Sequence, residues 1–172
     1  MILHTPRLAL RPLDRSDTAA MHRLMSDPEV MAYWDVPQID DPELTDRIIQ
    51  GHLQAMANGR SLSWAMLSHA GQAFVGCCDL SEIDRWHHRA EIGFIIGRRY
   101  WGDGLAAEAL RAVIDHAAQN LRLKRLCARA HLGNQRSVRL LQKLGFAQEG
   151  VLRGHVERDG ERRDCLMFGL LL

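Results

Sequence analysis

RRYWGDGLAAEAL, Arg98 to Leu110, is the stretch that decides how this sequence is interpreted. Gly102 and Gly104 stand two positions apart and lead directly into apolar residues at helical spacing. Glycine allows positive φ and leaves no Cβ between the backbone and a ligand. The first N–H groups of the following helix lack intrahelical partners and favour an anion. The stretch therefore predicts a backbone cradle for a phosphate group, or a glycine-rich turn that binds nothing.

The elements around this stretch do not alternate regularly. Strands are predicted at residues 7–13, 61–67, 73–81, 90–97 and 125–132 and on both sides of Asp159-Gly160, and helices at 16–25, 42–57, 104–117 and 134–146. The turn SHAGQ is expected to join the second and third strands as a hairpin. Three consecutive strands favour antiparallel pairing, whereas the later β-α-β unit needs a parallel pair. The sequence thus predicts an α/β (α+β) fold, with a mixed, mostly antiparallel central sheet and helices on both faces.

Capping residues mark the ends of several predicted helices. Ser16 is expected to cap the first helix, and Asp41 with Pro42 to open the second as N-cap and N1. Asn134 is the expected N-cap of the last helix, and Gly145 the residue just beyond its end.

The composition limits the classes of protein to which this chain can belong. The chain has 172 residues, a net charge of +1 and 47% hydrophobic residues, which predicts one globular domain over residues 1–172. This charge gives no reason to expect direct nucleic-acid binding. Without a secretory pattern at the start or an apolar run of membrane-spanning length, we expect a cytoplasmic protein. The four cysteines show no C-x-x-C spacing, so we expect buried free thiols and no metal site.

The glycines also fit a dinucleotide-binding fingerprint, G-x-G-x-x-A, from Gly102 to Ala107. That motif requires an acidic residue about 20 positions later for the ribose, and none occurs between Asp115 and Glu149. Lys124 and Arg125 could instead meet a 2′-phosphate, so an NADP oxidoreductase stays open as an alternative. A Walker A loop is absent, because no G-K-S/T follows.

Two motifs in order resemble the GCN5-related N-acetyltransferases (GNAT), most closely the branch that includes the ribosomal-protein N-terminal acetyltransferases (RimJ/RimL-like). The first is Arg99-x-x-Gly102-x-Gly104, similar to the pyrophosphate loop Gln/Arg-x-x-Gly-x-Gly/Ala, between the strand AEIGFIIG and the helix LAAEAL. The second is NQRSVRLLQKLGF, Asn134 to Phe146, similar to the family's N-x-x-A/S…LGF helix. Weaker matches in TPRLALRPL, DPEVMAYW and RDCLMFGLL extend the resemblance over nearly the whole chain.

The resemblance implies a GNAT-like fold with acetyl-CoA as donor and CoA as product. Pantetheine would lie along the strand that precedes the loop, where the sheet splays. The positions that correspond to cofactor-binding residues are Phe94, Ile95, Ile96, Arg99, Gly102, Asp103, Gly104, Leu105, Ala106, Asn134 and Ser137.

The resemblance also suggests catalytic groups. Glu91 matches a glutamate that some members use as a base through an ordered water, although it could equally face solvent or pair with Arg89. Ser137 matches a serine assigned to the departing thiolate in the ribosomal branch, although it could also bond only to backbone. Many members have a tyrosine for this task at the position of Leu141, so the chain departs from the family there.

The expected reaction is direct attack of a primary amine on acetyl-CoA in a ternary complex. The acceptor is expected to be an N-terminal α-amine of a protein or peptide. Alternatives are a small amine such as a polyamine or antibiotic, or an acyl-CoA-binding protein without turnover. Glu82 and Asp84 are lesser candidates for the base, and Trp34 and Trp64 for an acceptor pocket, although tryptophans are more often core. Family members often form dimers, so a homodimer is one expected assembly.

Overall fold

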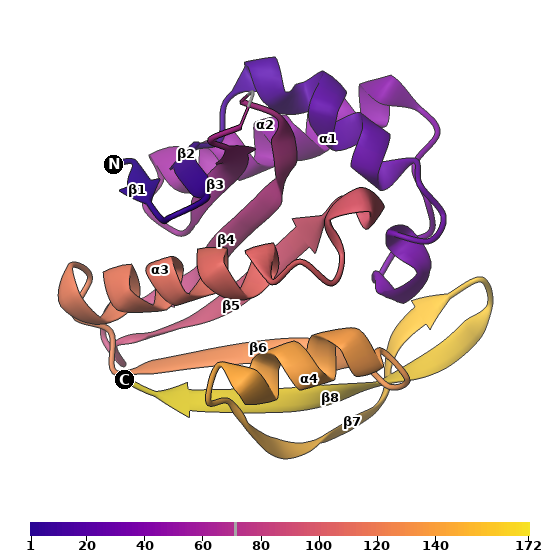
Figure 1. Ribbon diagram of the computed structural model, residues 1–172. Helices are drawn as coiled ribbons and strands as arrows, with labels where there is room; N and C mark the ends of the chain where they lie inside the picture. The colour runs from indigo at the N-terminus through magenta and orange to yellow at the C-terminus, as the bar shows by residue number, and fades with distance from the viewer. Residues whose placement is uncertain (71) are drawn as a thin grey trace.

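A computed structural model describes residues 1–70 and 72–172 (Figure 1). Its strands are β1 (Leu3–His4), β2 (Leu8–Pro12), β3 (Leu62–Ser68), β4 (Phe74–Asp84), β5 (Arg89–Ile96), β6 (Arg125–His131), β7 (Ala147–Arg158) and β8 (Glu161–Leu171). Its helices are α1 (Thr18–Met25), α2 (Pro42–Ala57), α3 (Leu105–Gln119) and α4 (Gln135–Lys143), with single 3₁₀ turns η1 (Arg15–Asp17), η2 (Met31–Tyr33) and η3 (Arg98–Tyr100). The predicted turn SHAGQ includes Gly71, which lies outside the described residues.

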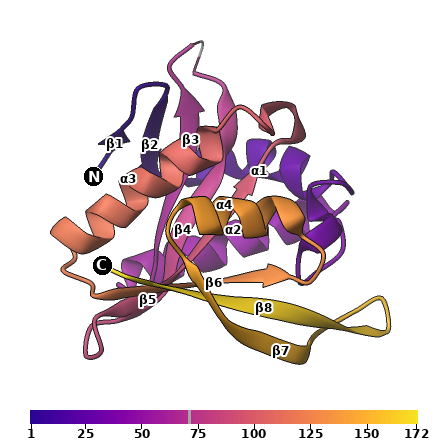
Figure 2. The ribbon, with the colours of Figure 1, turned by 60° about the horizontal axis from the view of Figure 1, so that its bottom comes forward.

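The described strands form one sheet in the order β1-β2-β3-β4-β5-β6-β8-β7. Within it only β5 and β6 pair in parallel, and the crossover between them contains α3. The mixed, mostly antiparallel sheet predicted from the sequence is therefore confirmed. Figure 2 shows that β7 and β8 continue together as a long hairpin past the end of β6.

Helices cover both faces of the sheet, as the sequence predicts (Figure 1). On one face, Leu110 and Val113 of α3 pack with Leu141 of α4 against strand residues such as Phe168. The opposite face packs against α1 and α2 through a second cluster that includes Met21, Ile49, Cys77 and Ile95. Neighbouring residues of a strand point to opposite faces, so adjacent Cys77 and Cys78 belong to different clusters.

The parallel seam between β5 and β6 is short. Arg89, Ala90 and Glu91 pair with Arg125, Leu126 and Cys127, and the pairing stops there. Residues 92–96 of β5 then continue along β4, whereas residues 128–131 of β6 continue along β8. The sheet therefore splays beyond Glu91, which gives the cleft that the resemblance implies.

Helix ends follow the predicted capping residues with one exception. Asp41 accepts a hydrogen bond from the N–H of Glu43 at 2.9 Å, with Pro42 as the next residue, and Asn134 caps α4. The prediction of Ser16 as the first cap is wrong. Asp14 accepts from the N–H of Ser16 at 2.7 Å, and its capping box with Asp17 turns residues 15–17 into η1 before α1 begins.

All four cysteines are free thiols, three of them buried and Cys127 half-buried. No helix within the described residues is both long enough and apolar enough to cross a bilayer.

Candidate active site

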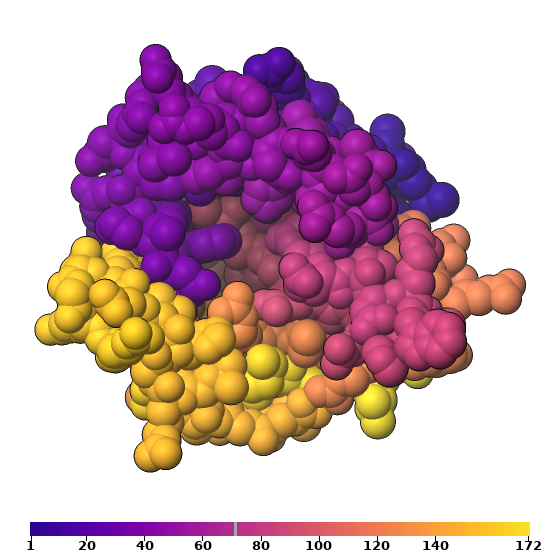
Figure 3. All heavy atoms as spheres, turned by 180° about the vertical axis from the view of Figure 1, so that it is seen from behind, coloured from indigo at the N-terminus to yellow at the C-terminus, as the bar shows by residue number. Residues whose placement is uncertain are grey.

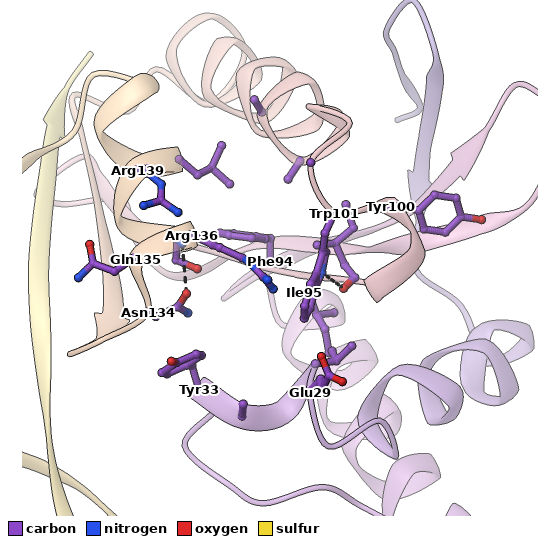
Figure 4. A pocket seen from close by; sticks show the side chains of 18 of the residues that line it. Glu29, Tyr33, Phe94, Ile95, Tyr100, Trp101, Asn134, Gln135, Arg136 and Arg139 are labelled. Carbon is purple, nitrogen blue, oxygen red and sulfur yellow. Dashed lines mark hydrogen bonds between the residues drawn. The ribbon is translucent and has the colours of Figure 1, made fainter.

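A pocket of about 960 Å³ opens at the splay of the sheet (Figure 4). Its walls come from the end of β5, the loop before α3, the first turns of α4, and a segment between α1 and α2. Of the residues predicted to bind cofactor, the pocket brings together Phe94, Ile95, Ile96, Gly102, Gly104, Ala106, Asn134 and Ser137.

The loop between β5 and α3 has the geometry of an anion cradle. Gly102 and Gly104 have φ of +88° and +77°, a region that glycine adopts without steric cost. Gly104 is the N-cap of α3, and no side chain caps this helix end. The first intrahelical bond runs from the N–H of Glu108 to the carbonyl of Gly104 at 3.1 Å, which leaves the N–H groups before it for a ligand. This cradle fits a diphosphate.

Arg7, in the turn between β1 and β2, braces the cradle from outside. Its guanidinium donates to the carbonyl of Asp103 at 2.9 Å and to the carboxylate of Glu108 at 2.7 Å. Thr5 donates to the same carboxylate at 2.6 Å. These contacts join residues about a hundred positions apart, so no local sequence signal could have revealed them.

The α4 wall carries three cationic side chains, Arg136, Arg139 and Lys143. None of them forms an ion pair within the described part of the chain. The guanidinium of Arg136 lies 4.4 Å from the ring centre of Trp101, another pocket residue. Their spacing of i, i+3 and i+7 places all three on one helix face, a signal present in the sequence that our sequence analysis missed. The charge of this wall suits the phosphates of a CoA ligand.

Asn134 and Ser137 form the turn at which α4 begins. The Oδ1 atom of Asn134 accepts a hydrogen bond from the N–H of Ser137 at 3.2 Å. Both residues line the pocket, so capping the helix and facing a ligand are compatible for Asn134. Leu141, where many relatives have tyrosine, is buried in the core.

Three other predicted cofactor residues do not line the pocket. Arg99 is exposed, with its guanidinium 4.6 Å from the ring centre of Tyr100. Asp103 is exposed and offers its carbonyl to Arg7. Leu105 is 8% exposed and packs in the core beneath α3.

Glu91 lies at the point where β5 and β6 separate, outside the pocket wall. Its carboxylate accepts a hydrogen bond from Nε of Arg129 at 3.0 Å. Glu91 does not pair with Arg89, which the sequence had left open, because Arg89 pairs with Asp84 at 3.3 Å. Burial lowers the pKa of Arg129, whereas Glu91 and Asp35 raise it; on balance the pKa of Arg129 is raised.

The two candidate tryptophans have different surroundings. Trp34 lines the pocket, in the segment before α2. The possibility that Trp64 lines it is wrong: this ring is 3% exposed in the core and meets His116 edge-on. Glu82 is exposed near the end of β4, and His87 and His88 lie on the exposed turn that follows, where Asp84 accepts from backbone N–H groups.

Arg158 of β7 holds the segment between α1 and α2 in place. Its NH1 group donates to the carbonyls of Met31, Ala32 and Trp34, at 2.6, 3.1 and 3.1 Å. The hairpin of β7 and β8 thereby holds the pocket wall that is formed by the segment between α1 and α2. Figure 1 shows the tip of this hairpin next to that segment.

Comparison with known proteins agrees with this geometry. The family model for the acetyltransferase (GNAT) domain matches residues 7–147. An N-acetyltransferase named p20 from Bacillus licheniformis is 33% identical over 98% of this chain and 95% of its own. The spermidine N(1)-acetyltransferase of Escherichia coli K12 is 30% identical over 91% of this chain and 82% of its own.

Solved structures share the fold. A ribosomal L7/L12 α-N-protein acetyltransferase, RimL, in complex with coenzyme A superposes with a TM-score of 0.91 at 22% identity, over 100% of this chain and 98% of that one. The NADP oxidoreductase alternative and the alternative without turnover are therefore wrong, since the family match and the relatives are acetyltransferases. The chain belongs to the GNAT family, and it is an acetyltransferase that uses acetyl-CoA.

Proposed function

We propose that residues 1–172 act as a single acetyltransferase domain whose acceptor is the N-terminal α-amine of a protein or peptide, as in the ribosomal-protein branch. The observation that carries this proposal is that Glu29, which lines the pocket, and Asp35, which follows the pocket residue Trp34, already have guanidinium partners. Glu29 pairs with Arg98, and Asp35 pairs with Arg129 at 3.5 Å and His131 at 2.8 Å.

The pairing of these carboxylates affects how well the pocket can recognise an acceptor with several positive charges. A polyamine carries several ammonium groups, and its recognition needs carboxylates without other partners. An α-ammonium carries one charge beside a peptide backbone, so its recognition needs fewer unpaired carboxylates. The pocket charges therefore favour a peptide, while the spermidine acetyltransferase at 30% identity makes a polyamine the second candidate.

The pKa of the acceptor favours the same assignment. An α-amine has a pKa of about 8 and an alkyl amine about 10.4, so deprotonation at pH 7 costs about 1.4 and about 4.6 kcal/mol respectively. An α-amine thus makes a smaller demand on the catalytic base.

Acetyl-CoA has a natural place in this pocket. We assign its pyrophosphate to the N–H groups of the loop around Gly102 and Gly104, with the cations of α4 near its phosphates. Its pantetheine would run along residues 94–96 of β5, on the edge that β6 leaves unpaired, and would meet Asn134. When bound, acetyl-CoA supplies the thioester that the amine attacks.

Transfer in one step from a ternary complex is supported by the placement of the thiols. Within the described residues no cysteine lines the pocket, so no side chain there is suited to carry the acetyl group. A backbone N–H between Ile92 and Phe94 would stabilise the oxyanion. The hydroxyl of Ser137 would donate a hydrogen bond to the thiolate as the C–S bond breaks, which suffices for a leaving group with a pKa of about 8.5.

The release of free CoA thiol tests the acceptor. A peptide with a free N-terminus is compared with the same peptide carrying a blocked N-terminus and an internal lysine, and with spermidine and spermine. We expect kcat/KM for the free N-terminus to exceed the others by at least about tenfold, equivalent to about 1.4 kcal/mol. Higher kcat/KM for spermidine would overturn the proposal in favour of the second candidate.

A further inference from the structure

Asp79 of β4 lies on the face of the sheet opposite α3 and beside the splay. It pairs with Gly93 of β5, two residues beyond Glu91, the last residue of β5 that pairs with β6. Alternation along the strand places Asp79 on the same face as Cys77, which packs in the cluster with α1 and α2. Figure 3 views the molecule from behind and shows a hollow between the purple atoms of the α1–α2 region, the yellow hairpin and the pink β4–β5 residues.

Gly93 makes room for this carboxylate. A Cβ built on Gly93 would lie 2.8 Å from Oδ1 of Asp79, closer than real Cβ contacts. The carboxylate therefore lies directly over the backbone of β5 at the start of its unpaired segment. Asp79 keeps some exposure to solvent at this position.

Two carboxylates meet on this face with different partners. Asp79 and Glu91 are diagonal neighbours, because Asp79 pairs with Gly93 and Ser81 with Glu91. Glu91 has a guanidinium partner in Arg129, whereas Asp79 forms no ion pair within the described residues. Protonation of Glu91 would break its ion pair with Arg129, whereas protonation of Asp79 would break no such pair.

We propose that Asp79 accepts the proton of the acceptor amine, and that Glu91, its diagonal neighbour on the same face, acts through it as a positioning residue. The inference rests on acetylation of an amine and holds for a peptide or a polyamine acceptor.

The protons balance as follows. The bound ammonium loses one proton to Oδ of Asp79, and the electron pair of the broken N–H bond stays on nitrogen. Nitrogen attacks the thioester carbon, the C–N bond forms, and collapse breaks the C–S bond, whose electron pair leaves with sulfur. The second amine proton neutralises the thiolate, and Asp79 returns its proton to solvent. The products are the acetylamide, CoA thiol and one proton in solution.

The surroundings of Asp79 suit this role at neutral pH. Burial raises the pKa of Asp79 to about 6 and the charge of Glu91 contributes to the rise, while Ser81 acts in the opposite direction. The other polar groups near it are the thiol of Cys77 on its own strand and Ser63, its pairing partner on β3, whose hydroxyl lies 3.5 Å from the ring of His52 in α2. Above pH 6 the carboxylate is free to take a proton, yet binds it more strongly than an ordinary aspartate.

The pH dependence of kcat tests the assignment, measured from pH 5 to 9 at saturating acetyl-CoA with whichever amine is turned over. We expect the wild type to lose activity below about pH 6. Asp79→Asn should lower kcat at pH 8 by about 100-fold or more, the usual contribution of a general base, and should abolish this acidic limb. Glu91→Gln should keep the limb but move it to lower pH, because a neighbouring negative charge is gone.

Asp115→Asn, at an exposed position of α3, is the matched control and should leave both kcat and the limb unchanged. Unaltered KM for acetyl-CoA in Asp79→Asn shows that the variant folds. If it does not fold, Gly93→Ala replaces it: the added Cβ displaces the carboxylate and should lower kcat without raising KM for acetyl-CoA. The proposal is overturned if Asp79→Asn or Gly93→Ala keeps full kcat, or if Glu91→Gln alone removes the limb. Failure of the peptide acceptor in the thiol-release assay leaves these comparisons intact, so the two proposals fail separately.

Discussion

At the scale of single residues, Gly102 and Gly59 share a backbone conformation but not an environment. Their φ values are +88° and +68°, and neither would meet another atom within 4 Å if it gained a Cβ. Gly102 lines the pocket, whereas Gly59 follows the end of α2. The two positions therefore separate the cost of backbone strain from the loss of a ligand contact.

We predict that Gly102→Ala and Gly59→Ala each lower the free energy of unfolding by about 1–2 kcal/mol, the cost of a left-handed non-glycine residue. Only Gly102→Ala should also raise KM for acetyl-CoA, because its Cβ stands where a phosphate would approach. Urea unfolding and steady-state kinetics measure the two effects. Equal KM in both variants would contradict the assignment of the loop as the pyrophosphate site.

Asp79 makes a second prediction, about stability and pH. Its pKa is about 6 in the folded protein and 3.8 as the reference value, so the folded state binds more protons between these values. The free energy of unfolding should therefore fall as the pH rises from about 4 to about 6. Above about pH 6, this group should cause no further decrease. Asp79→Asn removes this contribution, which is on the order of 3 kcal/mol. Chemical denaturation of both proteins at pH 4 and pH 7 measures the difference; parallel pH profiles would show that the carboxylate is solvated.

At the scale of elements, the long hairpin of β7 and β8 acts on a segment that it does not adjoin in sequence. The side chain of Arg158 is 10% exposed, and its bonds to three carbonyls fix the wall formed by residues 29–34. A strand at the edge of the sheet thus helps to shape the pocket.

We predict that Arg158→Met lowers the free energy of unfolding by about 2 kcal/mol, since hydrogen bonds to a charged donor contribute about 1.5–3. It should raise KM for the acceptor by about tenfold, equivalent to about 1.4 kcal/mol, with KM for acetyl-CoA nearly unchanged. Arg153→Met, on the same strand and exposed, is the control and should affect neither. A rise confined to the KM of acetyl-CoA would contradict the role of this wall.

Most elements could be predicted from local patterns, and the site only in part. Alternation and helical spacing identify the main strands and helices, and the paired glycines identify the cradle before α3. The two-residue strand β1 carries too little pattern to be recognised. Asp14 was missed as a cap because Ser16 and Asp17 offered competing oxygen acceptors.

Contacts between distant residues explain the rest. The position of Asp79 over Gly93 depends on strand register, and the contacts of Arg7 and Arg158 span about 100 and 125 residues. The pairing of Glu91 with Arg129 depends on the register between β5 and β6, which the predicted parallel pair does not specify. The roles assigned to Glu91, Ser137 and the cofactor-binding positions stay predictions.

At the scale of the whole molecule, the pocket lies between two groups of strands that share only three residue pairs. One wall belongs to β5 and α3, and the other to α4, which follows β6. A ligand that touches both walls should stabilise the whole protein through mass action.

We predict that acetyl-CoA at 100 times its Kd raises the free energy of unfolding by about 2.7 kcal/mol. Hydrogen exchange should slow most in residues 92–96 and 134–140, on the two sides of the splay. Thermal unfolding and exchange mass spectrometry measure both. NADP at the same concentration is the control and should change neither, and protection restricted to one wall would contradict a ligand that bridges them.

The order of the sheet also has a consequence for how the chain folds. Every described strand except β7 lies beside its predecessor in sequence, because β8 comes between β6 and β7. When two consecutive strands pair, the loop that closes is the segment that joins them, and the entropic cost of closure grows with the length of that segment. The hairpins β4–β5 and β7–β8 close over connections of four and two residues, whereas the pairing of β2 with β3 closes over residues 13–61 and that of β5 with β6 over residues 97–124. The hairpins are therefore expected to form first, and the three residue pairs of the parallel seam later.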